Sequence, residues 1–199
     1  LVFLLHQTYI DLYFFLFLTF LIGLLSDLRL VSSPFKRFVM QTILILFFIY
    51  SFDLQISLTR INLLDHFLVN IYFSVFFTCF CLVILLNGSN FIDGLNALVL
   101  SYYTIILIIL FKLNLTSVLI FEDIQSYYLI YFLFILIIYN FYNKFYLGDS
   151  GTYLLSFFVG FLLVDTYNNN LNISPFFIVL LLWYPCFENL FSIIRKFKF

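Results

Sequence analysis

Long apolar runs alternate with short polar breaks along the 199 residues. An α-helix needs about 20 consecutive apolar residues to span a bilayer, and the breaks divide the chain into runs of about that length. The runs cover residues 9 to 26, 37 to 57, 66 to 86, 95 to 112, 127 to 143, 152 to 168 and 173 to 194. The pattern predicts an all-α, polytopic transmembrane bundle of about seven helices, which forms a single domain over residues 1–199.

Composition excludes a soluble globular domain. Hydrophobic residues make up 65% of the chain and charged residues 10%, whereas about 25% charged residues is usual for soluble domains. The net charge is −1 and the basic residues form no long run, so we expect no nucleic-acid binding. Cys79, Cys81 and Cys186 lie inside apolar runs without metal-ligand spacing, and we interpret them as small buried hydrophobes.

Basic residues are unevenly divided between the two sides of the predicted membrane. If the breaks alternate sides, seven of the nine Lys and Arg share the side that also carries the C-terminal tail. These residues are Arg29, Lys36, Arg37, Lys144, Arg195, Lys196 and Lys198. By the positive-inside rule this side is cytoplasmic. We therefore expect a multi-pass protein of the plasma (inner) membrane whose polar breaks on this side face the cytoplasm.

The same alternation places Asp27, Asp93 and Asp149 at the cytoplasmic ends of different helices. We expect these helices to pack as neighbours, so that the three carboxylates converge. Acidic residues of the other side are scattered through loops without Gly and Asn neighbours, and we interpret them as solvated loop charges. They are Asp53, Asp65, Glu122, Asp123 and Asp165.

The break NGSNFIDGLN, from Asn87 to Asn96, is the most polar stretch between two membrane-length runs. One interpretation is a capped turn, in which Asn and Gly supply left-handed conformations. The other is a site for phosphate and a divalent cation, because backbone that leaves a helix at the bilayer edge needs water, protein or ligand partners. The residues alone leave both interpretations open.

Two further breaks on the cytoplasmic side carry candidate chemistry. Ser33-Pro34 is an ordinary helix start, and the following Lys36 and Arg37 either enforce topology or hold phosphate beside Asp27. In Gly148-Asp149-Ser150-Gly151, the glycines permit close backbone approach, the amides that open the next helix can face an anion, and Asp149 can hold a cation.

The string GDSG also occurs around serine-protease nucleophiles. Here Ser150 lacks a base, because His6 lies near the chain start and His66 falls on the opposite side of the membrane. In the last helix, Pro185 predicts a kink. Glu188 is either a functional intramembrane carboxylate or a shallow partner of Arg195 or Lys196.

The three cytoplasmic breaks and the last helix together resemble the polyprenyl-phosphate N-acetylhexosamine-1-phosphate transferases, the MraY/WecA-like enzymes of glycosyltransferase family 4. The family pattern GLLDD, followed by Ser-Pro and basic residues, resembles Gly23 to Arg37. NAxNFIDGxDGLA resembles Asn87 to Ala97, FMGDxGS resembles Tyr146 to Thr152, and PVFDxxxxIxRR resembles Pro185 to Lys196. The four motifs occur in the family's order and cover nearly the whole chain.

The resemblance implies an Mg²⁺-dependent transferase, with Mn²⁺ as a substitute, that moves an N-acetylhexosamine-1-phosphate such as GlcNAc-1-phosphate from a UDP-sugar to undecaprenyl or another polyprenyl phosphate. UMP is released and a lipid-linked glycan of the cell wall or lipopolysaccharide is begun. Asp149 would be the metal ligand, and Asp27 and Asp93 the catalytic carboxylates. The substrate-binding candidates are Asn87, Asn90, Asn96, Lys36, Arg37, Lys144, Gly148 and Ser150.

The chain departs from the family pattern at two positions. The usual Asp-Asp pair is Ser26-Asp27, and the second Asp of the Asn87 motif is Asn96. The first departure leaves open which carboxylate acts as a base. The early Gly-Gly loop and the His-rich loop of the family would precede Leu1 and follow Phe199, so we expect a fragment of a longer protein.

Three function classes remain open at this point. The transferase is the leading one, and a homodimer is compatible with it. A membrane transporter with a carboxylate-lined site is the second, although carriers place such groups near the bilayer midplane. The third is an inactive fragment.

Overall fold

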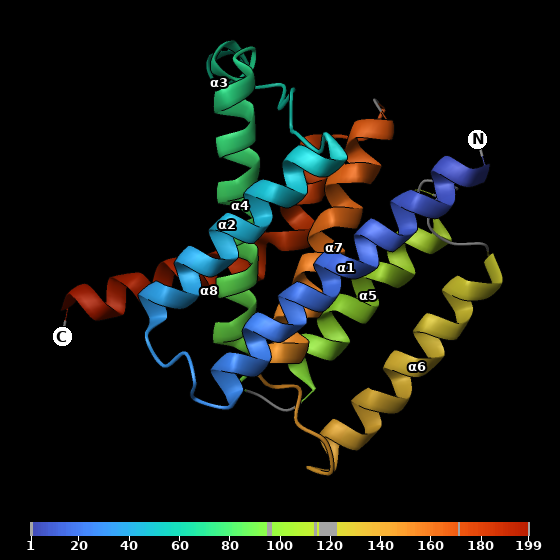
Figure 1. The fold of residues 1–199 in the computed structure, drawn as a ribbon, viewed down its shortest axis with the longest axis vertical. Helices are drawn as coiled ribbons and strands as arrows, with labels where there is room; N and C mark the ends of the chain where they lie inside the picture. The colour runs from blue at the N-terminus through green and yellow to red at the C-terminus, as the bar shows by residue number, and fades with distance from the viewer. Residues whose placement is uncertain (1, 95–96, 114, 116–122, 171, 199) are drawn as a thin grey trace.

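The computed structural model describes residues 2–94, 97–113, 115, 123–170 and 172–198, and every regular element in these ranges is an α-helix (Figure 1). The helices are α1 (Val2–Asp27), α2 (Pro34–Phe52), α3 (Asn62–Leu68), α4 (Ile71–Ile92), α5 (Leu98–Lys112), α6 (Asp123–Phe141), α7 (Gly148–Asn169) and α8 (Pro175–Lys198). The predicted all-α fold is confirmed, and each of the seven predicted runs corresponds to one of the longer helices.

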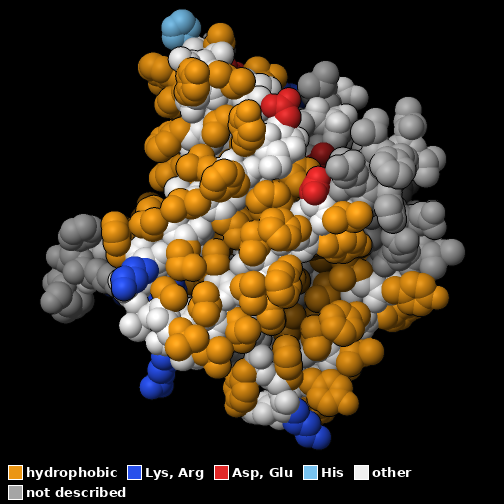
Figure 2. Space-filling model, viewed as in Figure 1, with side chains coloured by type: hydrophobic (Ala, Val, Ile, Leu, Met, Phe, Trp, Pro, Cys, Tyr) orange, Lys and Arg blue, Asp and Glu red, His pale blue; other side chains and the backbone are white. Residues whose placement is uncertain are grey.

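Five helices contain a segment long and apolar enough to cross a membrane, and the shorter α5 and the Tyr127–Phe141 part of α6 are also apolar. The chain is therefore a multi-pass membrane protein. Apolar side chains cover most of the face in Figure 2, as expected of a surface that meets lipid tails. On this face the Lys and Arg side chains lie toward the lower end, and the Asp, Glu and His side chains toward the upper end.

The short helix α3 was not predicted. Asn70 separates it from α4, because the Asn70 side chain accepts a hydrogen bond from the Tyr72 amide at 2.9 Å and so caps α4. Such a cap begins a new helix. The predicted run from residue 66 to 86 therefore begins inside α3, and its last turn extends to Ile92.

Helix α7 is the centre of the bundle and contacts α1, α4, α5 and α8. In its span 72% of the residues are buried, compared with 28% for α1 and α2. Aromatic rings fill the interface with α2: the centroid of Phe48, which is fully buried, lies 4.7 Å from that of Phe157 and 5.4 Å from that of Phe161. Because α7 contacts both α1 and α4, the helices that carry Asp27, Asp93 and Asp149 are neighbours, as predicted.

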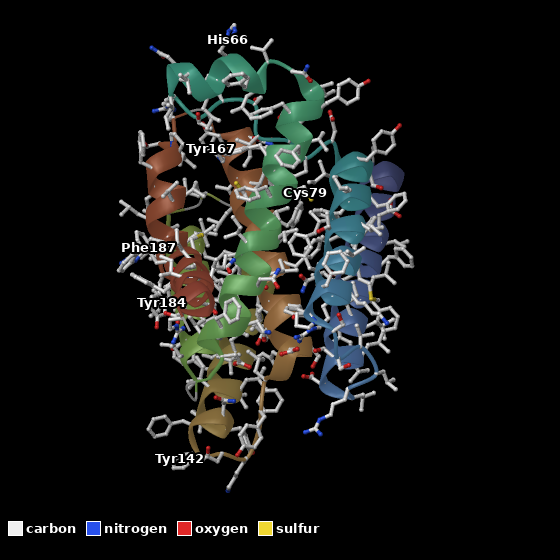
Figure 3. The ribbon with its side chains drawn as sticks, turned by 90° about the vertical axis from the view of Figure 1, so that its left-hand side faces the viewer. His66, Cys79, Tyr142, Tyr167, Tyr184 and Phe187 are labelled. Atoms are coloured by element: carbon white, nitrogen blue, oxygen red, sulfur yellow. The ribbon has the colours of Figure 1, made fainter. Side chains whose placement is uncertain are left out.

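The connections lie at the two ends of the bundle, which Figure 3 marks with Tyr142 and His66. We call the end with the α1–α2, α4–α5 and α6–α7 connections the site end, and the end with α3 and the α7–α8 connection the opposite end. Hydrogen bonds join the segments of each end: the Tyr167 hydroxyl donates to Leu58 O (2.7 Å) at the opposite end, and the Asp149 amide donates to Asp27 (2.9 Å) at the site end. The predicted alternation of the breaks is confirmed, whereas their orientation across a membrane stays a prediction.

Helix α8 continues through Pro185 and changes direction, so that its C-terminal half extends away from the other helices (Figure 1). The predicted kink is thus present. Its inner side lies against α4 at Gly88, where an added Cβ would be 2.1 Å from the Pro185 carbonyl oxygen. Beyond the kink, Glu188 pairs with Arg195 at 2.8 Å, which is the shallow pairing that the sequence left as one of two options.

Candidate active site

Asp27, at the end of α1, caps the start of α7. Its Oδ1 accepts a hydrogen bond from the Asp149 amide (2.9 Å) and its Oδ2 accepts one from the Ser150 amide (3.0 Å). These amides have no partner within their own helix, and the positive end of the helix dipole favours a carboxylate there. Gly148 allows the contact, because it has φ +65° and an added Cβ would lie 2.8 Å from Asp27 Oδ2.

A second glycine brings α1 and α7 together one turn earlier. An added Cβ at Gly23 would lie 2.3 Å from the Ser150 Cα and 2.6 Å from the Asp149 carbonyl oxygen. Any side chain at this position would push the two backbones apart. The sequence GLLSD, with Gly23 four residues before Asp27, is therefore what allows α1 to reach the start of α7.

Asp149 is held by groups from two other helices. The Arg37 guanidinium of α2 donates to Asp149 Oδ2 (2.7 Å) and to the Ser26 hydroxyl (2.6 Å), and Ser26 donates to the same Oδ2. Both Arg37 and Asp149 side chains are 22% exposed, so water screens this pair less than a surface pair. Both contacts reach Oδ2, and Oδ1 makes no hydrogen bond in the described part of the chain.

Asp93 follows the last turn of α4 and is close to the other two carboxylates. Burial is the main cause that raises its pKa, the neighbouring Thr152 hydroxyl lowers it, and the negative charges of Asp149 and Asp27 raise it, with the result that the pKa of Asp93 is about 6. The three predicted carboxylates therefore meet at the site end. A carboxyl group with such a pKa exchanges its proton near neutral pH.

The two asparagines of α4 belong to a polar cluster behind the carboxylates. Asn87 Nδ2 donates to Gln41 Oε1 of α2 (2.9 Å) and to the Val83 carbonyl of its own helix (2.9 Å). Asn90 Nδ2 lies 3.5 Å from the Tyr153 hydroxyl of α7. The cluster joins α2, α4 and α7 inside an otherwise apolar bundle.

Asn140, near the end of α6, connects two loops of the site end. Its side-chain oxygen accepts from the Ala97 amide, and its Nδ2 donates to the Phe145 carbonyl (2.7 Å). Ala97 has φ 62°, a left-handed conformation just before α5. Asn140 thus links the loop after Asp93 to the loop before Asp149.

The remaining predicted substrate-binding residues are Lys36, Lys144, Gly148, Ser150 and Asn96. Lys36 and Lys144 are exposed at the site end and form no ion pair with any described residue. Gly148 and Ser150 contribute to the α7 start that Asp27 caps. Asn96 lies outside the described residues.

Sequence reasoning missed Gln41 and Tyr153, which are 1% exposed. A signal for them was present, because residues four apart lie on the same helix face. Gln41 is four residues after Arg37, and Tyr153 is four residues after Asp149. Each missed polar group therefore lies one turn deeper in the bundle than a predicted charged residue.

The donor atoms suit a divalent cation such as Mg²⁺. No group of three or more His, Cys, Asp or Glu in the described ranges could enclose a metal by itself. Mg²⁺ does not require one, because it is usually held by one or two carboxylates together with water and substrate phosphates. Asp149, with Oδ1 free of hydrogen bonds, fits that mode of binding.

The sequence profile of glycosyl transferase family 4 matches residues 9–167. The chain belongs to this family, whose members are polyprenyl-phosphate sugar-1-phosphate transferases that act on UDP-sugars and generally depend on Mg²⁺. The resemblance to this family is thereby confirmed over residues 9–167, which contain three of the four motifs. The motif from Pro185 to Lys196 lies outside the matched range. No curated protein and no solved structure matches the chain.

Proposed function

We propose that this protein transfers an N-acetylhexosamine-1-phosphate, such as GlcNAc-1-phosphate, from a UDP-sugar to undecaprenyl or another polyprenyl phosphate. UMP leaves, and the product begins a lipid-linked glycan of the cell envelope. The observation that supports this is the convergence of Asp27, Asp93, Asp149 and Arg37 from four helices at one end of the bundle. A lipid headgroup and a water-soluble nucleotide can both reach groups that lie at one end of a membrane-spanning bundle.

Asp149 is our candidate for the metal ligand. A bound Mg²⁺ would neutralise charge that develops on the diphosphate as its bond breaks. Arg37 already offsets the charge of Asp149 through its contact with Oδ2. Together with the exposed Lys36 and Lys144, it supplies positive charge for two substrates that both carry phosphate.

Asp93 is our candidate for the base. Its pKa of about 6 lies close to the second pKa of a phosphate monoester, about 6. A proton can therefore pass from the lipid phosphate to Asp93 near neutral pH at small cost. Asp27 contributes differently, because both of its oxygens hold α7 amides. We assign it the positioning of Asp149 and Ser150.

The test uses the complete protein in lipid nanodiscs with UDP-N-acetylglucosamine, undecaprenyl phosphate and MgCl₂. We expect release of UMP and formation of a lipid-linked sugar, both lost with EDTA and restored by Mg²⁺. Other UDP-sugars in parallel identify the sugar. Uptake of substrate into sealed vesicles without UMP release would replace this proposal by a carrier function.

Membrane orientation is tested by cysteine labelling in intact cells. We expect a cysteine at Asn169, which is exposed at the opposite end, to react with an impermeant reagent from outside. A cysteine at Gly94, exposed at the site end, should react only after permeabilisation. Labelling of Gly94→Cys from outside would reverse the topology.

A further inference from the structure

The buried Gln41 side chain has no role in the motifs, although it makes a specific contact with one of them. It is 1% exposed in α2, and its Oε1 accepts a hydrogen bond from Asn87 Nδ2 at 2.9 Å. Asn87 is a proposed substrate-binding residue. A buried amide in a membrane bundle needs such a partner, because no water or lipid group replaces it there.

The orientation of both amides follows from one backbone carbonyl. The Val83 carbonyl can only accept a hydrogen bond, so the Asn87 atom 2.9 Å from it must be the donor Nδ2. The same Nδ2 faces Gln41, whose facing atom must therefore be the acceptor Oε1. Both N–H groups of Asn87 are consumed in this way.

The oxygen of Asn87 is the atom that remains for a ligand. Asn87 Oδ1 makes no hydrogen bond with the described residues, and Asn87 is only half-buried. An amide oxygen accepts hydrogen bonds and repels phosphate oxygens. Without Gln41, the Val83 carbonyl alone would hold the Asn87 NH₂ group, so the amide would be fixed by one hydrogen bond and not by two.

We infer that Gln41 is a positioning residue that holds Asn87 as a hydrogen-bond acceptor, so that Asn87 recognises an O–H or N–H group of the substrate and not a phosphate. This inference rests on the proposed function and specifies which substrate Asn87 serves. The headgroup of a polyprenyl phosphate offers at most one donor, the proton that we assign to Asp93, and otherwise only acceptors. The hydroxyl and amide groups of a UDP-sugar include donors, so Asn87 belongs to the nucleotide-sugar side of the site.

The other end of the Gln41 amide is also informative. Gln41 Nε2 is buried and has no hydrogen-bond partner of good geometry in the described part of the chain. The Tyr153 hydroxyl lies beside Gln41 and Arg37 and also near Asn90. Gln41 therefore lies between Asn87 on one side and the Tyr153 hydroxyl on the other.

The experiment measures KM for each substrate in the complete protein with Gln41→Met, and with Gln41→Leu as a second variant of different shape. We expect KM for the UDP-sugar to rise about five- to tenfold in both, while KM for the polyprenyl phosphate and kcat change less than twofold. Thr104→Val is the matched control, because Thr104 is 2% exposed and bonds only within its own helix, at Leu100 O. It should leave both KM values unchanged.

A double-mutant cycle with Asn87→Ala decides whether Gln41 acts through Asn87. If it does, Gln41→Met adds little to the KM of Asn87→Ala. An equal rise of both KM values, a fall in kcat alone, or fully additive effects would overturn the inference. If the wild-type protein releases no UMP from any UDP-sugar, the proposed function has failed. The inference is then tested by the thermal midpoints of Gln41→Met, Asn87→Ala and the double variant. If the shift of the double variant is smaller than the sum of the two single shifts, the Gln41–Asn87 coupling is supported, whereas additive shifts overturn it.

Discussion

Polar side chains at the opposite end of the bundle hold loops in place, whereas at the site end charged side chains from different helices meet. At the opposite end, the Tyr167 hydroxyl donates to Leu58 O (2.7 Å) and Asn168 donates to Gln55 O (3.1 Å). These contacts satisfy loop carbonyls and hold the loops against α7. A hollow of about 470 Å³ lies beside these contacts and is lined by three segments, residues 53–58, 68–74 and 167–168. Asp53 is the one charged residue among the described residues of this lining, so they form no charged cluster.

The site end instead gathers like charges. Asp27, Asp93 and Asp149 come from three helices although their negative charges repel, and the pKa of Asp93 is raised to about 6 by burial and by this repulsion. Such an arrangement does not improve stability. Groups that shift one another's pKa in this way cluster at functional sites. The comparison predicts that neutral substitutions at the site end remove function, and that those at the opposite end affect only stability.

The largest expected effect is that of Asp149→Asn. The substitution keeps the size of the side chain and removes the charge that holds a hard cation. Loss of metal-assisted charge stabilisation should lower turnover on the order of a thousandfold, with expression and membrane insertion unchanged. UMP release at saturating Mg²⁺ measures this.

Asp53→Asn is the matched control for Asp149→Asn at the opposite end. Asp53 has φ 48°, a conformation that Asn adopts readily, and its side chain accepts only from Gln55. Turnover should stay within twofold of wild type. If Asp149→Asn keeps more than about a tenth of the wild-type rate, the loss is near 1.4 kcal/mol or less, and Asp149 is only an ion-pair partner of Arg37.

Asp93→Asn should lower turnover about a hundredfold, since general-base catalysis contributes about 10²- to 10⁴-fold. In the wild-type enzyme, kcat/KM should fall below a pH of about 6, where Asp93 takes up its proton. The residual activity of the variant should lack this acid limb. A wild-type rate that is flat from pH 5 to 8 would assign the base to another group.

Stability gives an independent readout of the same carboxyl group. Its pKa in the folded protein, about 6, is above the ordinary value of 3.8 for an aspartate, so the folded state binds the proton more tightly than the unfolded state does. The stabilisation that the protonated Asp93 gives the folded state is therefore lost as the pH rises from about 4 through 6. Asp93→Asn should raise the thermal midpoint at pH 8 and change it little at pH 4. A lower midpoint at pH 8 would contradict the raised pKa.

The sequence predicted the charged residues of the site well and their contacts poorly. Asp27, Asp93 and Asp149 stood out because they interrupt membrane-length apolar runs, and helix parity alone placed them at one end. This alternation of helix ends between the two sides gives no information on the distances between the three residues or on their hydrogen-bond partners. The capping of α7 by Asp27 depends on two glycines whose backbones approach another helix, and Gln41 is an amide within an apolar run. Such contacts arise only when three helices have packed.

A similar limit applies to the fold. Membrane-length runs identify long helices, because the bilayer sets their length. They cannot detect α3, a helix of seven residues that ends before the Asn70 cap. The central position of α7 was also not predictable from its hydropathy, which is the lowest of the five candidate spans. Polar residues of α7 lower that average. Thr152, Ser156 and Thr166 among them are fully buried, so they lie against other helices and do not face lipid.

Gly23→Ala should produce an intermediate effect. The added methyl group would meet the Ser150 backbone at 2.3 Å, and overpacking of this kind costs about 1–3 kcal/mol. We expect a lower thermal midpoint and a several-fold loss of turnover, because Asp27 moves away from α7. Gly94→Ala is the control for stability alone, since its added Cβ would meet nothing within 4 Å. Equal midpoints for the two variants would mean that α1 and α7 are not in close contact.

The smallest expected effect is that of Asp65→Asn at the opposite end. Asp65 Oδ1 accepts hydrogen bonds from the Thr59 hydroxyl and amide, both at 2.6 Å. The hydrogen bond from the Thr59 hydroxyl is the main cause that lowers the pKa of Asp65, and backbone amides of residues 59 to 61 add to it. Because its pKa is lowered, the ionised Asp65 stabilises the folded state above pH 3.8. This stabilisation is lost as the pH falls further.

The asparagine in Asp65→Asn keeps an acceptor oxygen but loses the charge, and Asp65 is only partly buried. We therefore expect the thermal midpoint to fall by roughly one or two degrees at pH 7, and not at pH 3. Turnover should stay unchanged. If Asp65→Asn lowered UMP release as strongly as Asp93→Asn does, the two ends would be coupled through α7, and the opposite end could no longer be described as structural.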